Sequence, residues 1–296
     1  MAAITTTIGL PVARRRSRRA VDILKHPTVV ASALVLATMV FVAIAAPLIA
    51  PYDPYEQHLE GRLGPPLWAG GSLTHPFGTD QLGRDVLTRL MYGARVSIAI
   101  GVMAVLVSGV LGVAAGVTAG FYGGIVDELL MRLADLRLAL PFVLLVISVI
   151  AVFGPSFTNL IVILGLTGWV PYAKIVRAEA LSMREREFIV AARAVGARNS
   201  RLMFRHILPN TVAAAIVIGS LELANIIVVE ASLSFLGLGV QAPTPSWGNM
   251  LGEARDYLMS NFWLATLPGI AISVTAISVN LIGDWLRDVL DPRIQT

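Results

Sequence analysis

The chain has 296 residues, of which 56% are hydrophobic and 14% are charged, and its formal net charge is +4. Soluble domains usually carry about 25% charged residues, and a mean hydropathy of +0.74 implies more apolar surface than a soluble protein of this size can bury. Cys is absent, which excludes disulfides, iron–sulfur clusters, thiolate metal sites and cysteine nucleophiles. The composition therefore predicts a membrane protein.

Two classes of enzyme are excluded by motifs that the sequence lacks. Its only lysines, Lys25 and Lys174, do not follow glycine, so the chain has no Walker A motif for binding ATP phosphates. The four histidines are scattered and form no HExxH zinc motif. We therefore expect a chain without catalytic residues, which neither hydrolyses ATP nor acts as a metalloprotease, and which holds no metal or cofactor of its own.

Long stretches without Asp, Glu, Lys or Arg predict the membrane spans, because a helix needs about 20 apolar residues to cross the hydrocarbon core. These stretches are 26–52, 96–126, 138–173 and 257–283. A turn signal around Gly154 divides the third into two spans, and 209–236 is apolar apart from two glutamates. The sequence therefore predicts six transmembrane helices, at about 28–48, 94–121, 134–153, 157–176, 209–236 and 262–285.

The first span is long and no clear small-residue cleavage site follows it, so it predicts an uncleaved anchor helix. The fold class that we expect is an all-α polytopic membrane protein, with this anchor followed by a five-helix core. The expected regions are a cytoplasmic basic arm (1–27), the first span (28–48), an extracytoplasmic segment (49–93), the core (94–290) with a cytoplasmic loop at about 177–208, and a cytoplasmic tail (291–296).

The distribution of Lys and Arg predicts the orientation, because cytoplasmic segments carry the excess of these residues. Eighteen of the 23 Lys and Arg residues lie in the N-terminal arm, near 122–137, within 174–206 and in the tail. We therefore expect both termini in the cytoplasm, and 49–93 and 237–261 outside it. The arginine run at 14–19 could bind nucleic acid, but beside a span it is more typical of an orientation signal at anionic lipid, and no nucleic-acid partner is expected.

The most informative cytoplasmic segment is residues 187–196, which read EFIVAARAVG. The pattern predicts a short amphipathic helix that ends at Gly196, a residue suited to a C-terminal cap. Ala191 and Ala192 are small enough for another backbone to approach closely. A second basic helical stretch follows and enters the membrane near Pro209. The alternative interpretation is an ordinary loop between two spans.

This segment resembles the EAA loop of binding-protein-dependent ABC importer permeases, which reads Glu-Ala-Ala, three residues, Gly, nine residues and Ile-x-Leu-Pro. The matching residues are Ala191, Ala192, Gly196, Leu208 and Pro209. Val190 stands where the family has Glu, and His206 stands where it has Ile. The acidic residue three places earlier, Glu187, is similar to the pattern of the peptide-importer branch.

Two further blocks, 75–95 and 231–248, resemble the second permease subunit of dipeptide, oligopeptide and nickel ABC importers. The resemblance implies a coupling helix that docks on a separate ATPase. It implies as partners a homologous permease, two ATPase subunits or domains that bind ATP and Mg²⁺, an extracytoplasmic binding protein and the lipid of a bacterial inner membrane. The implied coupling residues are Glu187, Ala191, Ala192, Arg193, Gly196, Leu208 and Pro209.

The implied function is to form half of the translocation pathway for dipeptides or oligopeptides. Nickel and glutathione are alternative substrates within the same family. A rival from another class, an intramembrane enzyme or sensor, would need a nucleophile with its base, or a metal cluster, inside the spans. The spans carry only isolated carboxylates without a nearby His, so the transport hypothesis is favoured.

The block at 75–95 mixes acidic and basic side chains. Asp85 and Arg89 are four residues apart, as are Arg84 and Thr88, so each pair can meet on one face of a helix. His75 is the only nearby imidazole, which makes a metal site improbable. We expect an ion-paired start to the second span, with direct contact to substrate as the alternative.

A stripe of small residues, Ser108, Gly112, Gly116 and Gly120, recurs at every fourth position of the second span. Such a stripe allows helices to approach closely. The contact could lie within this subunit or with the partner permease, and the sequence leaves both possibilities open.

Two carboxylates, Glu222 and Glu230, lie within the fifth predicted span, and Asn225 is three residues from the first of them. A carboxylate inside a membrane is costly, so it usually faces a bundle interior, a partner or water. We therefore consider these three residues as candidates for the translocation pathway, with structural pairing as the other interpretation.

Overall fold

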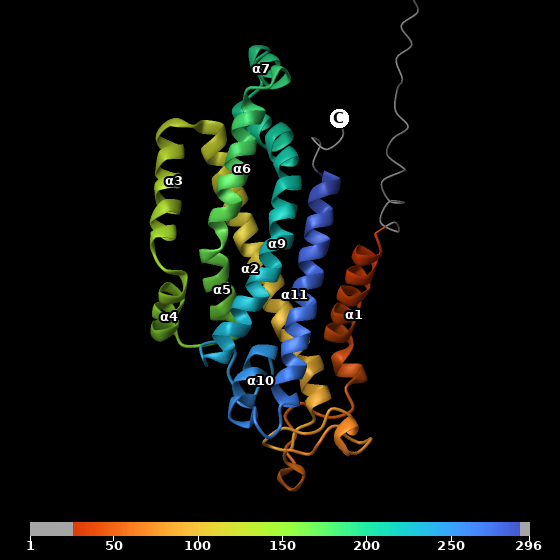
Figure 1. Cartoon of the computed structure of the whole chain (residues 1–296). Coiled ribbons are helices and arrows are strands. Elements are labelled where there is room, and N and C mark those ends of the chain that lie inside the picture. Colours follow the sequence, from red (N-terminus) through yellow and green to blue (C-terminus); the bar gives the residue numbers. More distant parts are fainter. Residues whose placement is uncertain (1–25, 291–296) are drawn as a thin grey trace, which may run out of the picture.

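The computed structural model describes residues 26–290, so the predicted arginine-rich arm and the C-terminal tail lie outside the described residues. Within 26–290 the regular structure is helical, apart from one isolated bridge between Thr79 and Asp85. Long helices run side by side through the whole length of the bundle (Figure 1). The prediction of an all-α membrane protein is confirmed.

Five segments are long and apolar enough to cross a membrane. Four are built on α1 (Pro27–Ile49), α2 (Val86–Tyr122), α9 (Leu208–Phe235) and α11 (Trp263–Leu290), and the fifth combines α5 (Phe157–Thr167) with α6 (Trp169–Arg184). The remaining helices are α3 (Gly124–Ala139), α4 (Phe142–Phe153), α7 (Glu187–Ala194), α8 (Asn199–Leu202) and α10 (Trp247–Ala254). Short turns complete the described chain: η2 (Leu59–Gly61), η3 (Leu67–Ala69), η4 (Met203–Ile207) and η5 (Arg255–Tyr257).

The third predicted span, 134–153, is not one straight helix. The chain forms α3 and α4 instead, which are bent by 88° where they meet. Leu140 is extended, with ψ of 126°, because the proline that follows it disfavours helical backbone at the preceding residue and cannot donate an N–H. The bent pair supplies the sixth span when its two helices are counted together.

Helix α2 begins at Val86, eight residues before the expected start at 94. Its start is fixed by Asp85, whose carboxylate accepts a 2.7 Å hydrogen bond from the backbone N–H of Thr88 and so satisfies one of the free donors of the first turn. The stretch without charged residues predicted only the part of α2 that is surrounded by other apolar groups. The helix itself extends into the charged block before it.

The two ends of the bundle carry different structures (Figure 1). At one end α7 projects beyond the other helices, and α11 finishes on the same side; we call this the α7 end. At the opposite end lie α10 and the loops between α1 and α2, which we call the α10 end. The predicted cytoplasmic loop therefore reaches the α7 end, and the predicted outer segments lie at the α10 end. The segment near 122–137, also predicted to be cytoplasmic, instead forms most of α3, which runs along α6.

Helices α2 and α6 touch through the small-residue stripe. A Cβ on Gly112 would lie 2.4 Å from Cβ of Tyr172, and one on Gly120 would lie 2.7 Å from Cβ of Ala180. Ser108 donates a 3.1 Å hydrogen bond from Oγ to the carbonyl oxygen of Gly165 in α5. Of the two possibilities that the sequence left open, the structure shows packing within this subunit.

We expect Gly116→Ala to lower the stability of the folded chain. The new Cβ would lie 2.6 Å from the carbonyl oxygen of Ala173, so the backbones must separate, at a cost of about 1–3 kcal/mol. This cost exceeds the gain in helix propensity of up to about 1 kcal/mol. Thermal unfolding of the purified protein in detergent measures the difference.

Gly109→Ala is the matched control, because its Cβ would lie 3.6 Å from the Tyr172 ring, an ordinary contact. Gly109→Ala should leave the unfolding temperature equal to that of the unmodified chain or raise it. Equal unfolding temperatures for both alanine variants would contradict the close packing of α2 on α6.

Candidate functional site

The end of α7 is closed by a glycine cap. Gly196 has φ of +85°, a left-handed conformation that is costly for other residues. The N–H of Gly196 donates to the carbonyl of Arg193 at 3.0 Å, and the N–H of Ala197 donates to the carbonyl of Ala192 at 3.0 Å. The second bond is the 6→1 bond of a Schellman motif. The predicted helix with its C-terminal glycine is present.

One side of α7 is anchored in the bundle. Ile189 is fully buried, and it belongs to an apolar cluster with Met183 of α6, Leu202 of α8 and Ile207 of η4. Ala192 is half-buried against the same cluster. A displacement of α7 must therefore act on both helices that flank it.

The other side of α7 is exposed and apolar. Phe188, Val190 and Val195 are 46%, 56% and 86% exposed. Charged residues surround them, among them Glu187 and Arg193, which are exposed. A raised apolar patch with a charged rim is typical of a protein-binding surface. We call these five residues the α7 patch.

Two of the predicted residues lie at the start of α9, away from this patch. Leu208 is half-buried and Pro209 is exposed, and the helix before them widens into the π-helical turn η4, where the N–H of Leu208 bonds to the carbonyl of Met203. Proline has no backbone N–H, so it cannot continue the α-helical hydrogen bonds. The wide π-helical turn before Pro209 accommodates this missing donor. Residues 199–235 thus form one continuous helical rod.

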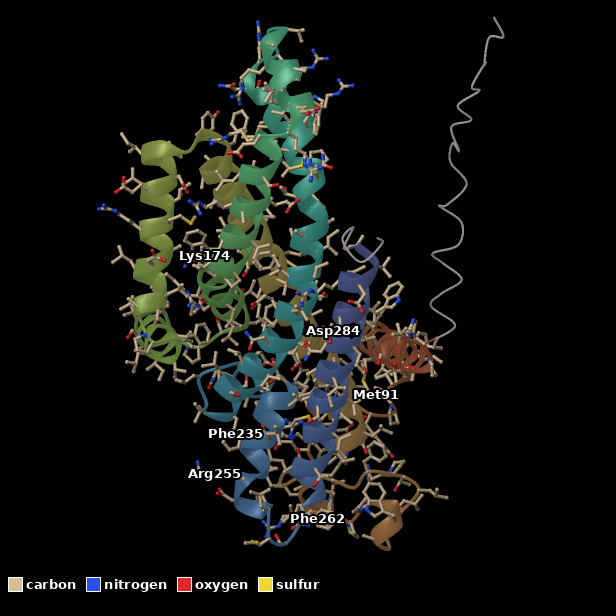
Figure 2. The ribbon with its side chains drawn as sticks, turned by 45° about the horizontal axis from the view of Figure 1, so that its top comes forward. Met91, Lys174, Phe235, Arg255, Phe262 and Asp284 are labelled. Atoms are coloured by element: carbon tan, nitrogen blue, oxygen red, sulfur yellow. The ribbon has the colours of Figure 1, made fainter. Side chains whose placement is uncertain are left out.

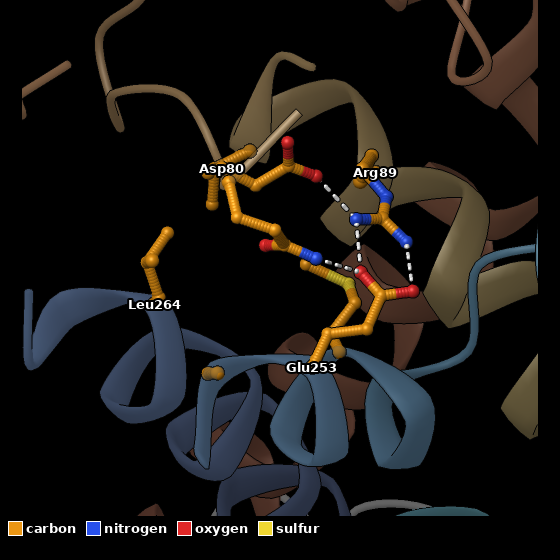
Figure 3. Close-up of a pocket in the computed structure, with 8 residues that line it drawn as sticks. Asp80, Arg89, Glu253 and Leu264 are labelled. Carbon is orange, nitrogen blue, oxygen red and sulfur yellow. Dashed lines mark hydrogen bonds and ion pairs between the residues drawn. The ribbon is translucent and has the colours of Figure 1, made fainter. Parts of the chain in front are cut away.

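At the α10 end, four charged side chains form a network in which Asp80, Arg84 and Arg89 are buried and Glu253 is half-buried. Figure 3 shows Asp80, Arg89 and Glu253. Arg84 donates from Nε to Asp80 at 2.7 Å and from Nη2 to Glu253 at 2.7 Å. Arg89 donates from Nη2 to Glu253 Oε1 at 3.1 Å and also bonds to Asp80. Two positive and two negative groups are thus matched. The network joins the start of α2 to α10, which follows it by more than 150 residues.

The ion-paired start of α2 was predicted, but its pairs differ from those expected. Asp85 does not pair with Arg89; it caps α2 and lies 2.9 Å from Nδ1 of His75. Sequence reasoning also missed Glu253, because a lone acidic residue in a distant segment carries no local signal. The network holds the start of α2 against α10, and Asp80, Arg89 and Glu253 line a small pocket there.

Of the three candidates on α9, Glu222 and Asn225 lie together and Glu230 lies apart from them. Glu222 is half-buried, and it accepts a long 3.4 Å hydrogen bond from Nδ2 of the exposed Asn225. Glu230 is fully buried and accepts a 2.7 Å bond from Oγ of Ser234, beside Ser97 of α2 and Ser246 at the start of α10. Glu222 and Asn225 are thus reachable from the surface, whereas Glu230 lies in the core.

Comparison with known proteins decides the family. Residues 112–296 match the model of the binding-protein-dependent transport system inner membrane component. The chain belongs to this family. Residues 20–66 match the N-terminal transmembrane domain of oligopeptide transport permease C. The family match includes α7, its glycine cap and α9.

Curated relatives resemble the chain over most of its length. A di/tripeptide transport system permease of Pseudomonas aeruginosa is 43% identical over 263 residues, which cover 88% of this chain and 87% of the relative. A dipeptide transport system permease of Escherichia coli K12 is 44% identical over 258 residues, or 87% and 86% of the two chains. One from Haemophilus influenzae is 40% identical over 86% of each. The chain is a permease subunit of a transport system.

The charge network makes a prediction about pH. Burial opposes ionisation of the Glu253 carboxyl, but hydrogen bonds and charge from Arg89 and charge from Arg84 outweigh burial and lower its pKa below 4.5. A carboxyl whose pKa is lower in the folded chain stabilises the fold above the unfolded value near 4.5, and this stabilisation is lost as pH falls through the folded value.

We therefore expect Glu253→Gln to lower the free energy of unfolding by about 3 kcal/mol at pH 7, since it leaves buried arginines underpaired. The difference from the unmodified chain should shrink below pH 4.5. Thermal unfolding in detergent across this range measures it. Glu56→Gln is the control, because that carboxylate is 51% exposed. A difference independent of pH would contradict the assigned pKa direction.

Proposed function

We propose that the chain is the second permease subunit of an ABC importer of dipeptides, and that it forms half of the translocation pathway. The observation that carries this proposal is α7, a short helix closed by Gly196 that projects from the bundle (Figure 1). Its exposed side presents the apolar α7 patch. The names of the relatives supply the substrate class, because they are di/tripeptide and dipeptide permeases.

In this proposal the α7 patch docks on a separate ATPase, which binds ATP and Mg²⁺. The burial of Ile189 among α6, α8 and η4 couples any movement of α7 to the long helices, so that closure of the ATPases moves the permease largely as a rigid body. The proposed coupling residues are Glu187, Ala191, Ala192, Arg193, Gly196, Leu208 and Pro209.

The other half of the pathway belongs to a homologous permease, and two ATPase subunits or domains complete the transporter. An extracytoplasmic binding protein delivers the peptide at the α10 end. Glu222 and Asn225 face the pathway, and Glu230 supports the contact between α9, α2 and α10 from within the core. The chain itself makes and breaks no covalent bond.

The proposed location is the bacterial plasma membrane, with the α7 end and both termini in the cytoplasm. The absence of Cys allows this orientation to be tested by single-cysteine labelling. Both Ser200, in α8 directly after α7, and Ser72, in the loops between α1 and α2, are exposed. A Cys at position 200 should react only from the cytoplasmic side and one at position 72 only from outside; the reverse pattern would overturn the orientation.

The function is tested by reconstituting the whole transporter, with its partner permease, ATPases and binding protein, in liposomes. The unmodified complex should accumulate a radiolabelled dipeptide with ATP hydrolysis. Gly196→Val should reduce uptake and either uncouple or abolish hydrolysis, because a β-branched residue at φ of +85° costs about 1–3 kcal/mol and distorts the end of α7.

Two variants control this experiment. Gly196→Asn should retain most uptake, since Asn tolerates the left-handed conformation, and Ala194→Val adds the same side chain at an exposed helical position. Normal uptake by Gly196→Val at normal assembly would contradict the role of the cap. Uptake of nickel or glutathione in place of dipeptide by the unmodified complex would refute the proposed substrate.

A further inference from the structure

Exposed polar side chains lie along one side of the contact between α9 and α11. On α9 they are Asn225 and Ser232, and on α11 they are Ser273 and Asn280; all four are exposed in the described chain. Both helices are candidate membrane spans. A polar side chain inside a span usually faces a bundle interior, a partner or a water-filled cavity, because lipid offers it no hydrogen bonds. The place of these four side chains therefore requires an explanation.

The four side chains form two levels, because each helix repeats its polar residue after seven positions. Seven residues make nearly two complete helical turns and advance the chain by about 10 Å, so the second residue returns to the same face. Ser232 follows Asn225 by seven residues on α9, and Asn280 follows Ser273 by seven on α11. The helices run in opposite directions (Figure 1). The two serines therefore share one level and the two asparagines share the other.

Contacts between the helices fix this register. Nearer the α10 end, Ser232 and Ser273 line the same cavity of about 480 Å³, together with Phe235 of α9. Nearer the α7 end, a Cβ on Gly283 would lie 2.8 Å from Oγ of Ser220. The two asparagines lie between these contacts, so the same packing brings them to one depth on the same side of the helix pair.

We call Asn225, Ser232, Ser273 and Asn280 the α9/α11 seam. Figure 2 labels the residues just beyond its two ends, Phe235 on α9 and Asp284 on α11. An asparagine side chain both donates and accepts hydrogen bonds, as a peptide group does. The separation of about 10 Å between the two levels is the length of about three extended residues. The seam thus matches a short peptide in chemistry and in length.

We propose that the α9/α11 seam lines a water-filled translocation pathway and binds the peptide groups of the substrate. The two asparagines hydrogen-bond to its N–H and C=O groups. The cavity at the serine level is otherwise lined mostly by apolar side chains, and it receives an apolar side chain of the peptide. This assignment rests on the proposed function, because it requires a peptide as substrate. It adds α11 as a wall of the pathway, for which the sequence indicated α9 alone.

The absence of Cys in this chain allows each position of the seam to be tested for contact with water. The assembled transporter is placed in lipid nanodiscs, where a charged thiol reagent reaches both faces of the membrane, and labelling is read from the mass of this chain. The test variants are Asn225→Cys, Ser232→Cys, Ser273→Cys and Asn280→Cys. All four should react, because only an ionised thiol reacts and burial in apolar surroundings opposes ionisation.

Two control variants define slow labelling. Ser278→Cys makes a matched change on α11 at a side chain that is buried. Ile44→Cys lies on the anchor helix α1 at a side chain that is 74% exposed and is expected to face lipid. The seam positions should react about tenfold faster than either control, or more. Seam positions that react as slowly as the controls would face lipid or a dry protein contact, and would overturn the proposal.

Asn225→Leu and Asn280→Leu test the contact with the peptide. Each keeps the size of the side chain and removes its hydrogen bonds, so the maximal rate of dipeptide uptake, at equal amounts of assembled transporter, should fall about fivefold. The unfolding temperature should not fall, because both positions are exposed. Asn280→Gln keeps the amide and should retain most of the rate. Unchanged uptake by both leucine variants would overturn the assigned contact.

The two experiments separate this inference from the proposed function. If the unmodified transporter takes up no dipeptide, the proposed function itself fails, and the labelling still decides whether the seam faces water. If it takes up dipeptide and the seam positions label like the controls, only the seam fails.

Discussion

The close approach of α2 to α6 is the contact on which the rest of this structure depends. Gly112, Gly116 and Gly120 leave no room for a Cβ between the two backbones, and the helices touch along several turns. Association in a membrane depends on such packing, because lipid is as apolar as the side chains and supplies little hydrophobic driving force. The α7 patch and the charge network at the α10 end are each joined to one of these two helices.

Helix α6 leads directly into α7, and it also places Tyr172 in the middle of the bundle between α2 and α9. Helix α2 carries the buried arginine that binds α10 at the opposite end. In the proposed function, a movement that begins at the α7 patch therefore acts on α6, which extends to Tyr172 between α2 and α9. The same rigid pair extends to the end at which the binding protein is proposed to deliver its substrate.

The chain buries charge in two different ways. At the α10 end, Arg84 and Arg89 share two carboxylates at hydrogen-bonding distance, and the charges balance. Near the middle of α9, the carboxylate of Glu222 accepts a single long hydrogen bond, from Asn225. A fully satisfied network makes a structure rigid, whereas a carboxylate with one long bond contributes little to rigidity. This contrast separates the structural charges from those that we assign to the pathway.

The sequence by itself determined the features whose signals are local. Stretches without charge predicted the spans, since a charge inside lipid is costly, and Gly196 predicted the end of α7 because few other residues adopt its conformation. The small-residue stripe predicted a close contact, although not its partner. The sequence also identified Glu222 as anomalous, because an acidic residue in an apolar stretch is visible without a structure.

Only the tertiary structure decided which distant groups meet. It supplied Glu253 as the partner of two arginines more than 160 residues earlier, and it placed Glu230 in the core and Glu222 near the surface. It also showed that Leu140 and Pro141 break the third span, which hydropathy could not distinguish from a straight helix. Composition and local spacing limit the conformation that each segment can adopt. Contacts between side chains of different segments depend on how the helices pack, and the whole chain sets that packing.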